Sequence, residues 1–403
     1  MTLVSIDDVR AAAVRLRDVL QPTPVEPSRA VSEVVGHEVV LKLENLQRTG
    51  SFKLRGAYNR IALLDDDERR RGVVCASAGN HAQGVALGAR LQGVDATVYM
   101  PANAPLPKVS ATLGYGAHVE LVDGVVDDCL ARAQEHADRE GAVLVHPFDH
   151  PDVIAGQGTL GLELLEQVPA AATVVVCVGG GGLVSGVAVA VAALRPDVRV
   201  VGVQATGAAS FPASLAQGAP TTLPTVETIA DGIAVKRPGE LTLAHVRALV
   251  DEVVTVDDET IARAVTLLLE RAKQVVEPAG AVGVAALLAG LVDPGDGPTV
   301  AILSGGNIDP LVLQHIITGG LTAEGRYVTL RTRVPDRPGE LARLLALIAA
   351  ERANVVTVEH HRFQRRQRFG QVEVVLELEA RGAEHVAHLR DAMQRAGYPA
   401  TVV

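Results

Sequence analysis

A lysine at the start of a predicted helix is the residue best suited to covalent chemistry. Lys53 lies in the run TGSFKLRGA, within a helix that we predict over residues 51–64 and that Thr49 or Ser51 would cap. A cation in the first turn faces the positive end of the helix dipole, which lowers the pKa of the amine. Schiff-base chemistry requires a neutral amine. By spacing alone, a solvated lysine at a helix start is the commoner interpretation.

A polar turn follows the apolar strand predicted over residues 73–76. It has the sequence SAGNHAQG and contains Ser77, Asn80 and His81. In α/β folds ligands bind at the carboxyl ends of parallel strands, and the backbone N–H groups and small side chains of such a turn suit a carboxylate. The same residues would also serve as an ordinary capped turn, so the motif alone leaves both interpretations open.

A run of glycines follows the strand predicted over residues 173–178 and opens a helix: Gly179, Gly180, Gly181, Gly182 and Leu183. Glycines let the backbone approach an oxyanion, and the N–H groups of a helix N-terminus suit a phosphate. A dinucleotide fingerprint fails, because no glycine triplet fits G-x-G-x-x-G and Gln204 stands where an acidic ribose ligand belongs. Tight packing of strand on helix would need one or two glycines. In a fourth segment, SGGN, Ser304 follows a predicted strand and can point into a cleft.

These motifs belong to alternating apolar strands and alanine-rich helices in the first 320 residues. Strands are predicted over residues 39–43, 73–76, 96–100, 117–121, 173–178, 199–204 and 299–303, and helices over 51–64, 82–91 and 260–274. Continuous apolar strands separated by helices predict an α/β fold, with parallel sheets covered on both faces. The strands suffice for two such sheets, and therefore for two lobes with a cleft between them.

The pattern changes after a short polar segment at 319–326, which suits a linker. The elements predicted beyond it are strands over 327–334, 354–361, 371–379 and 401–403, and helices over 338–352 and 384–396. Their βαββαβ order is the ferredoxin-like arrangement. A basic run between two strands, which we interpret as a solvated hairpin, contains Arg362, Arg365, Arg366 and Arg368.

In this order, SFKLRGA, SAGNHAQG, GGGGL and SGGN resemble the motifs of the pyridoxal-phosphate-dependent threonine/serine dehydratases, which have the tryptophan-synthase-β-like fold type II. The segments HPFDHPDVIAGQGT, TIADGIAVKRPGELT and VVEPAGAVG resemble the same family. The resemblance covers roughly residues 1–320. It implies a catalytic domain over residues 1–318, with a small lobe at about 47–152 inserted in a large lobe.

The resemblance also implies roles for the motif residues. Lys53 would bind pyridoxal 5′-phosphate covalently, which reverses the interpretation as a solvated lysine. The other residues implied at the cofactor are Phe52, Asn80, Gly179, Gly180, Gly181, Gly182, Leu183 and Ser304, and those implied at the substrate are Ser77, Asn80 and His81. Ser304 would meet the pyridine nitrogen, where a neutral hydroxyl, unlike a carboxylate, favours β-elimination. Glu277 would border the pocket or would simply be a carboxylate at a helix end.

Two differences from related serine racemases restrict the chemistry. Those racemases carry a second serine in the SAGNH turn, and the corresponding residue here is Ala78. They also bind a divalent cation through acidic residues after a strand, whereas residues 204–210 of this chain contain no carboxylate. Because a hard cation prefers charged oxygen ligands, we expect no metal at this place.

The module over residues 327–403 resembles an ACT regulatory domain. The effector-binding residues that this resemblance implies lie in the run DRPGEL: Pro338, Gly339, Glu340 and Leu341. A helix start there presents N–H groups to an amino-acid carboxylate. ACT domains usually pair through their sheets. We therefore expect a branched-chain amino acid as effector and a homo-oligomer, either a dimer or a tetramer.

Charge and composition argue against several partner classes. The chain has 37 Lys and Arg against 47 Asp and Glu, and a net charge of −10 argues against nucleic acid and anionic membranes. Residues 169–194 carry no charge, but the glycines at 179–182 interrupt them, so a membrane span is not expected. Three scattered cysteines and the absence of a signal-peptide pattern predict a cytoplasmic protein with reduced thiols.

The resemblance thus implies an ammonia-lyase that converts L-threonine to 2-oxobutanoate and ammonia, acts on L-serine to give pyruvate, and is regulated through its ACT domain. The nearest alternative is a dehydratase that prefers serine. A second alternative, from a different class, is a non-catalytic amino-acid sensor that kept the fold. The presence of Lys53 argues against the sensor.

Overall fold

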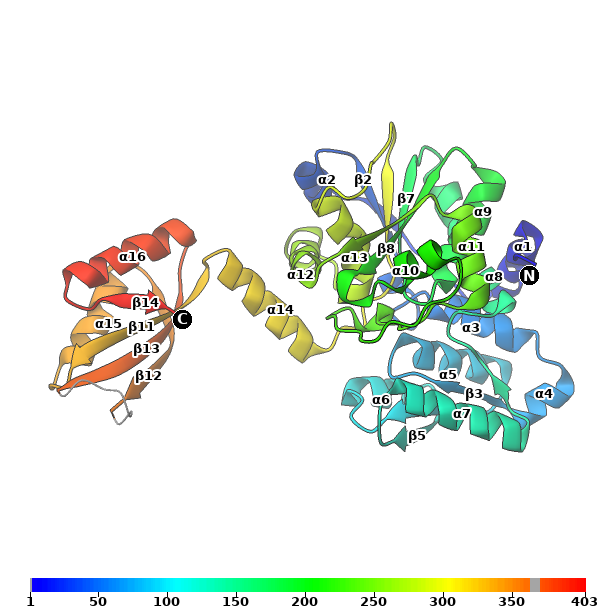
Figure 1. Ribbon diagram of the computed structural model, residues 1–403, viewed down its shortest axis with the longest axis horizontal. Coiled ribbons are helices and arrows are strands. Elements are labelled where there is room, and N and C mark those ends of the chain that lie inside the picture. The colour runs from blue at the N-terminus through cyan, green and yellow to red at the C-terminus, as the bar shows by residue number, and fades with distance from the viewer. Residues whose placement is uncertain (1, 363–369) are drawn as a thin grey trace. The chain divides into compact units, whose positions relative to one another are not determined.

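The computed structural model describes residues 2–362 and 370–403, in two compact units that divide between Pro310 and Leu311. Figure 1 shows the helices and strands of both units. Among the described residues the first unit contains two sheets and the second contains one. The hairpin predicted around Arg365, Arg366 and Arg368 falls at 363–369, outside the described residues.

A six-stranded sheet in the order β1-β2-β10-β7-β8-β9 forms the large lobe of the first unit. Its strands are β1 (Val25–Pro27), β2 (Val39–Leu43), β7 (Thr173–Cys177), β8 (Arg199–Ala205), β9 (Glu252–Val256) and β10 (Thr299–Leu303). All pairs are parallel except that of β1 with β2. Every residue of β2, β7 and β10 is buried, as expected for apolar strands covered on both faces. The sequence patterns did not predict the edge strands β1 and β9.

A parallel four-stranded sheet in the order β5-β4-β3-β6 forms the small lobe. Its strands are β3 (Val73–Ala76), β4 (Ala96–Pro101), β5 (His118–Val122) and β6 (Val143–Leu144). Val98 and Met100 of β4 are fully buried against Ile61 and Val85, which come from two covering helices. The two parallel sheets expected from the sequence are therefore present.

Helices cover both sheets of the first unit and approach one another closely where glycines meet. They are α1 (Ile6–Leu16), α2 (Arg29–Val35), α3 (Lys53–Ala62), α4 (Asp66–Arg71), α5 (Asn80–Gln92), α6 (Leu106–Gly114), α7 (Val126–Glu140), α8 (Pro151–Gln167), α9 (Gly182–Leu194), α10 (Ser210–Gln217), α11 (Glu240–Leu249), α12 (Asp258–Leu267) and α13 (Pro278–Leu288). The shorter helical elements are η1 (Glu44–Leu46), η2 (Thr206–Ala208), η3 (Asp231–Ile233) and η4 (Leu268–Ala272). A Cβ added to Gly156 of α8 would lie 2.6 Å from the Cα of Gly56 in α3, so α3 is held tightly against α8.

The second unit has the βαββαβ order that the sequence predicts. Its elements are β11 (Tyr327–Pro335), α15 (Glu340–Ala350), β12 (Asn354–His361), β13 (Gln371–Glu379), α16 (Ala383–Arg395) and β14 (Ala400–Val402), and they form an antiparallel sheet in the order β12-β13-β11-β14. Leu330, Val374 and Leu376 of the sheet are fully buried with Leu344 and Leu389 of the two helices. This cluster is a hydrophobic core separate from those of the first unit.

Helix α14 (Pro310–Ala323) precedes this sheet and includes part of the predicted linker. Residues 319–323 are helical, and the domain end predicted at 318 falls inside α14. Gly319 and Gly320 each disfavour a helix by about 1 kcal/mol relative to alanine. The helix nevertheless continues, and the Thr322 hydroxyl donates back to the carbonyl of Thr318 at 2.8 Å. The glycine content suggested a linker, whereas residues 319–323 form the end of a helix that the sequence patterns did not predict.

Candidate active site

The loop before α3 is joined to the loop after β10. Ser51 forms an isolated antiparallel bridge with Gly305, and the Phe52 N–H donates to the Ser304 carbonyl at 3.1 Å. Phe52 therefore occupies the N-cap position of α3, with no side-chain hydrogen bond. The predicted cap by Thr49 or Ser51 is wrong, because the pairing with Gly305 holds Ser51 in extended backbone outside the helix.

Lys53, the first residue of α3, has a half-buried side chain. Its Nζ donates to the carbonyl of Pro147 at 3.0 Å and lies 5.2 Å from the centroid of the Phe52 ring. Burial lowers the pKa of Lys53 to about 8, against the opposing influence of Cys177 and Glu277. The predicted direction is confirmed, but the main cause is desolvation rather than the helix dipole. A substantial fraction of this amine is neutral near pH 8.

A chain of amide and carboxyl groups holds Asn80, the first residue of α5. Asn307 Nδ2 donates to Asn80 Oδ1 and to the Thr49 carbonyl, both at 2.7 Å. Asn80 Nδ2 donates in turn to Glu277 Oε1 at 2.6 Å. Glu277 is 4% exposed, and burial together with the charge of Asp231 raises its pKa to about 7. Glu277 therefore borders the site, and the amide of Asn80 is held in one orientation.

The glycine run between β7 and α9 is closely packed at every position. A Cβ on Gly180 would lie 2.2 Å from the Phe148 ring, and one on Gly182 would lie 3.0 Å from the Phe148 backbone. One on Gly179 would lie 3.0 Å from a backbone atom, and Gly181 has a φ of +94°. These contacts are with residues outside β7 and α9, such as Phe148 and Ile233, so the glycines give room to several neighbouring segments and not only to the packing of strand on helix. The run still opens α9, whose first N–H groups have no partner within the helix.

Asp149 connects the glycine run to α11 from a third element. Its carboxylate accepts hydrogen bonds from the N–H groups of Glu240, Leu241 and Thr242, each at 3.0 Å. The Thr242 hydroxyl donates to the Gly180 carbonyl at 2.7 Å. Asp149 thus acts as a helix N-terminal cap supplied by a distant segment, and it fixes α11 beside the glycine run.

Ser304 follows β10 directly and is only 2% exposed. Its Oγ lies 3.2 Å from Sγ of Cys177, the last residue of the neighbouring strand β7. Burial raises the pKa of Cys177 to about 11, so this thiol stays protonated. The sequence patterns identified Cys177 only as a reduced thiol, because its neighbour is set by the order of strands in the sheet.

The turn after β3 contains Ser77, and His81 follows it as the second residue of α5. Ser77 Oγ accepts a hydrogen bond from the Gly79 N–H at 3.1 Å. His81 is 4% exposed, and its Nε2 donates to the Val145 carbonyl at 2.8 Å. Burial lowers the pKa of His81 to about 3, so the imidazole is neutral. At this turn an anionic ligand would meet the N–H groups at the start of α5 rather than a charged histidine.

Arg55, two residues after Lys53, connects α3 to the large lobe through ion pairs. It is 1% exposed and pairs with fully buried Glu44 at 2.8 Å and with Glu163 of α8 at 2.7 Å. Lys42 of β2 pairs with Glu163 at 3.0 Å. Because an unpaired buried charge is strongly destabilising, this cluster holds the first turn of α3 in place.

These groups suit an aromatic aldehyde that carries a phosphate. The amine of Lys53 would take the carbonyl, the Ser304 hydroxyl a ring nitrogen, and the start of α9 a phosphate. Ser51, next to this loop, is fully buried, and its hydroxyl has no hydrogen-bond partner among the described residues. The site therefore contains a polar atom still available to a ligand.

Two family models match the chain, one over each of its two units. Residues 16–305 match the model described as pyridoxal-phosphate dependent enzyme, and residues 328–387 match the ACT domain. The L-threonine ammonia-lyase of Thermotoga maritima is 47% identical over 401 residues, which span 100% of both chains. The chain belongs to the pyridoxal-phosphate-dependent L-threonine ammonia-lyase family. Pyridoxal phosphate is the cofactor of this family, and the residues described above fit it.

Solved structures show the same two-lobed architecture as this family member. Maize serine racemase has a TM-score of 0.75 and 39% identity, covering 80% of this chain and 100% of its own. The processed form of threonine deaminase isoform 2 from Solanum lycopersicum has a TM-score of 0.73 and 35% identity, covering 78% and 94%. The expected fold type II architecture with a C-terminal ACT domain is confirmed.

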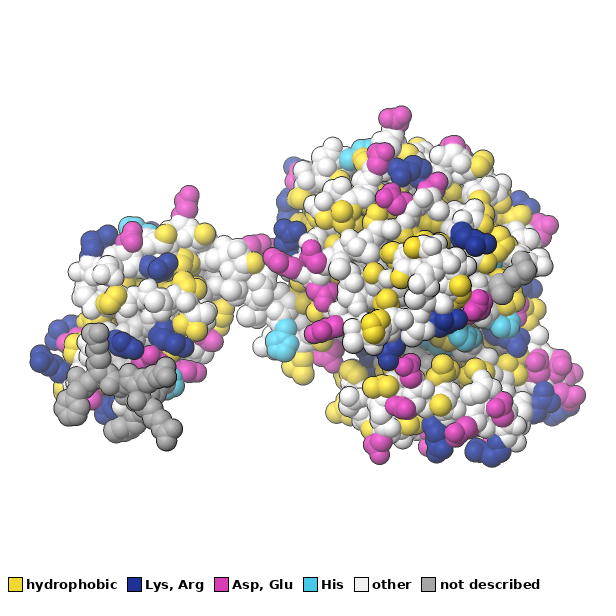
Figure 2. Space-filling model, viewed as in Figure 1, with side chains coloured by type: hydrophobic (Ala, Val, Ile, Leu, Met, Phe, Trp, Pro, Cys, Tyr) yellow, Lys and Arg dark blue, Asp and Glu magenta, His cyan; other side chains and the backbone are white. Residues whose placement is uncertain are grey.

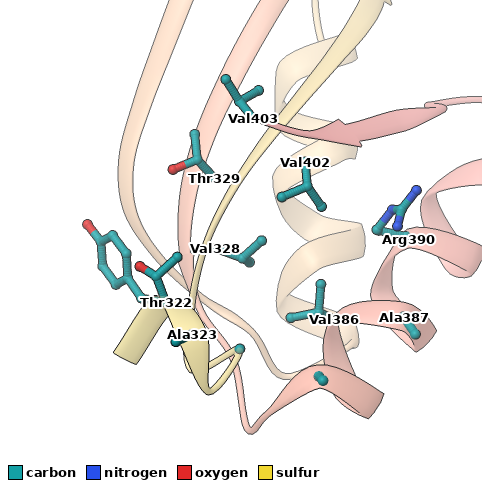
Figure 3. Close-up of a pocket in the computed structure, with 12 residues that line it drawn as sticks. Thr322, Ala323, Val328, Thr329, Val386, Ala387, Arg390, Val402 and Val403 are labelled. Atoms are coloured by element: carbon teal, nitrogen blue, oxygen red, sulfur yellow. The ribbon is translucent and has the colours of Figure 1, made fainter. Parts of the chain in front are cut away.

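The ACT domain has an uncrowded helix start at α15 and a cavity beside α16. At the first, Gly339 has a φ of +89° at the N-cap of α15, and nothing lies within 4 Å of where its Cβ would be. The adjoining Glu340 accepts a hydrogen bond from the Tyr398 hydroxyl at 3.0 Å. The second is a cavity of about 300 Å³ between the end of α14, β11, β14 and α16, with apolar walls and the guanidinium of Arg390 (Figure 3).

Besides Cys177, sequence reasoning missed three site residues: Asn307, Pro147 and Asp149. Asn307 stands in SGGN, and the other two stand in HPFDHP, so the motifs contained them without indicating their partners. Within the described residues, no helix is long and apolar enough to cross a membrane, and no three metal-ligating side chains cluster. On the face of the first unit shown in Figure 2, Lys and Arg side chains are interspersed with Asp and Glu.

Proposed function

We propose that this chain converts L-threonine to 2-oxobutanoate and ammonia, with Lys53 as the covalent lysine and the base. The Thermotoga relative named for this activity matches the chain over its whole length. The observation that carries the proposal is the position of the Lys53 amine at the start of α3, 3.0 Å from the Pro147 carbonyl and 5.2 Å from the centroid of the Phe52 ring. Burial there lowers its pKa to about 8. In the same site, the protonated Cys177 contacts the neutral Ser304, whose Oγ lies 3.2 Å from its Sγ.

The proposed division of labour follows the contacts at the site. Bound pyridoxal phosphate supplies the electron sink that makes the substrate Cα proton acidic. Lys53 Nζ removes that proton, because its lowered pKa leaves a substantial fraction of the amine neutral near pH 8. The groups proposed to hold the cofactor are Phe52, Asn80, Gly179, Gly180, Gly181, Gly182, Leu183 and Ser304. We propose that the substrate carboxylate binds where the turn after β3 meets α5, with contacts from Ser77, Asn80 and His81.

We propose elimination rather than racemisation as the main reaction. A racemase needs a second acid or base on the opposite face of the substrate, and the methyl group of Ala78 can neither give nor take a proton. Maize serine racemase is similar to this chain in fold and in overall sequence. That similarity does not provide a proton donor or acceptor at Ala78. L-Serine is proposed as a second substrate because it differs from threonine by one methyl group, which an apolar pocket distinguishes by only about 1–3 kcal/mol.

Steady-state rates with L-threonine and L-serine test this proposal. Formation of 2-oxobutanoate and pyruvate is measured together with chiral chromatography of the remaining serine. We expect both 2-oxo acids and little D-serine. A higher kcat/KM for serine would favour the serine-preferring dehydratase. D-Serine formed as fast as pyruvate would overturn the assignment to elimination, and no product from either substrate would favour the amino-acid sensor.

The ACT domain supports regulation by an amino acid, and we propose a branched-chain one, isoleucine first, because 2-oxobutanoate is a precursor of its carbon skeleton. The proposed contacts lie at the start of α15, at Pro338, Gly339, Glu340 and Leu341, where backbone N–H groups of the first turn act as donors and Pro338, which has no N–H, contributes only packing. Coupling between effector and active site is typically about 1–3 kcal/mol, or 5- to 150-fold in affinity.

Two matched variants locate the effector within the ACT domain. Gly339→Ala adds a methyl group at the start of α15, and Arg390→Gln removes the guanidinium from the separate cavity. Isoleucine and valine are titrated against the full chain and against both variants. We expect the response to weaken in Gly339→Ala and to persist in Arg390→Gln. The opposite result would place the effector in the cavity.

We also propose a homo-oligomer, a dimer or a tetramer, in the cytoplasm. The edge strand β12 exposes Val356 by 44% and Val358 by 36%, which leaves an apolar sheet edge open to a second copy. The cysteines at 75, 129 and 177 are free and buried, in keeping with a reducing compartment. Light scattering at several protein concentrations tests the oligomer, and a constant monomer mass would contradict it.

A further inference from the structure

The side-chain hydroxyl of Ser304 has a neighbour that the family motifs do not include. Cys177 Sγ lies 3.2 Å from Ser304 Oγ, and the two residues are 5% and 2% exposed. They stand at the carboxyl ends of β7 and β10, which pair in parallel register. Among the residues that the structure describes, Cys177 is the one whose side chain is hydrogen-bonded to this hydroxyl. The sheet therefore holds the thiol and the hydroxyl side by side.

The number of protons on this pair of side chains limits the hydrogen bonds that they can form. A serine hydroxyl has one proton to donate and lone pairs with which to accept, whereas thiol sulfur is a weak donor and a weak acceptor. Burial raises the pKa of Cys177 to about 11, so the S–H proton is retained at neutral pH. If the S–H group donates to Oγ, the proton of Ser304 is free to point elsewhere. Because both side chains are buried, bulk water competes little for these positions.

We propose that Cys177 is a positioning residue that directs the hydroxyl proton of Ser304 toward the ring nitrogen of the bound cofactor. The inference rests on the proposed role of Ser304 at that nitrogen. A pyridine nitrogen is a far better acceptor than a thiol sulfur, so the strongest donor of the pair, the O–H, goes to the nitrogen. The weaker S–H then donates to the oxygen and restrains its rotation. The nitrogen is thereby kept unprotonated, in keeping with elimination.

The opposite arrangement makes a different prediction. If the Ser304 O–H donated to Cys177 Sγ, a lone pair of the oxygen would face the ring nitrogen and would favour its protonated form. Loss of the thiol would then free the hydroxyl to donate to the nitrogen, and the cofactor would become less protonated. The absorption spectrum of the bound cofactor, followed against pH, distinguishes the two arrangements without any substrate.

The test uses the holoenzyme with three substitutions at one position. Cys177→Ala and Cys177→Val remove the donor while lying below and above the thiol in volume, and Cys177→Ser restores a donor. We expect kcat for L-threonine to fall about two- to five-fold in the Ala and Val variants, with KM unchanged, because one weak hydrogen bond is lost. In both variants the protonated form of the cofactor should become more populated. Cys177→Ser should recover the wild-type rate and spectrum.

A double-mutant cycle with Ser304→Ala separates positioning from packing. If Cys177 acts through the hydroxyl, Cys177→Ala should cause no further change in spectrum or rate in the Ser304→Ala background. An equal loss in both backgrounds would overturn the proposal and assign Cys177 to packing. A spectrum that shifts toward the unprotonated form in Cys177→Ala would establish the opposite arrangement. Failure of the proposed reaction would appear separately, as a wild-type enzyme that binds cofactor without deaminating threonine.

Discussion

Replacing Glu277 by Gln should stabilise the cofactor-free protein at pH 8 much more than at pH 5. Burial and the charge of Asp231 raise the pKa of Glu277 from 4.5 to about 7 in the folded protein. Between these two values the unfolded chain has released the proton and the folded chain has kept it. The free energy of unfolding therefore falls as the pH rises through this window. The two pKa values correspond to a loss of roughly 3 kcal/mol.

The glutamine variant isolates this charge because it keeps the hydrogen bond. Its amide oxygen can still accept from Asn80 Nδ2, which donates to Glu277 Oε1 at 2.6 Å in the wild-type protein. It has no proton to release at any pH in the window. The gain in stability from Glu277→Gln should thus be larger by about 2–3 kcal/mol at pH 8 than at pH 5.

Urea unfolding curves, followed by far-UV circular dichroism at pH 5 and pH 8, measure this difference. Glu166→Gln, which changes an exposed glutamate on α8, is the control and should give the same small effect at both pH values. The ACT domain is identical in all three proteins, so its contribution cancels. The reasoning is refuted if Glu277→Gln has the same effect at both pH values, or if it destabilises the protein at pH 8.

The remaining predictions concern the lysine, its supporting cluster and metal dependence. Lys53→Ala should lose turnover and the absorbance of covalently bound cofactor while keeping its circular dichroism, and a borohydride-reducible lysine adduct in this variant would contradict the assignment. Because burial lowers the pKa of Lys53 to about 8, the rate at which cofactor-free enzyme recaptures pyridoxal phosphate should rise with pH through about 8 and then level off, as stopped-flow absorbance can measure. Arg55→Met should cost about 3–5 kcal/mol in urea unfolding by leaving Glu44 buried without its partner, and Glu44→Gln in the same chain should recover part of that loss. EDTA should leave the rate of 2-oxobutanoate formation unchanged, since residues 204–210 contain no carboxylate.

The sequence by itself determined the family, the central strands of both lobes and the element order of the second unit. Apolar runs such as residues 39–43 and 299–303 are strands with the predicted ends, because a buried parallel strand needs apolar side chains on both faces. The βαββαβ order of the second unit followed from the alternation of apolar and polar residues in its strands and the helical spacing of apolar residues in its helices. The motifs at Lys53, Asn80 and the glycine run lay at the ends of strands and helices. The residue types that form turns and helix starts at such places are adjacent in the sequence. All of these features depend on residues close together in the chain.

Only the tertiary structure decided which distant groups meet and what that does to their chemistry. Cys177 and Ser304 are 127 positions apart and become neighbours through the strand order β10-β7. Asn80 and Glu277, 197 positions apart, meet across the two lobes. The lowered pKa of Lys53 was predicted from a local dipole, but its main cause is burial, which depends on everything packed around the amine. Folding brings together the groups that form these hydrogen bonds and that exclude water from the amine. These groups come from distant parts of the chain, so no local pattern in the sequence contains them.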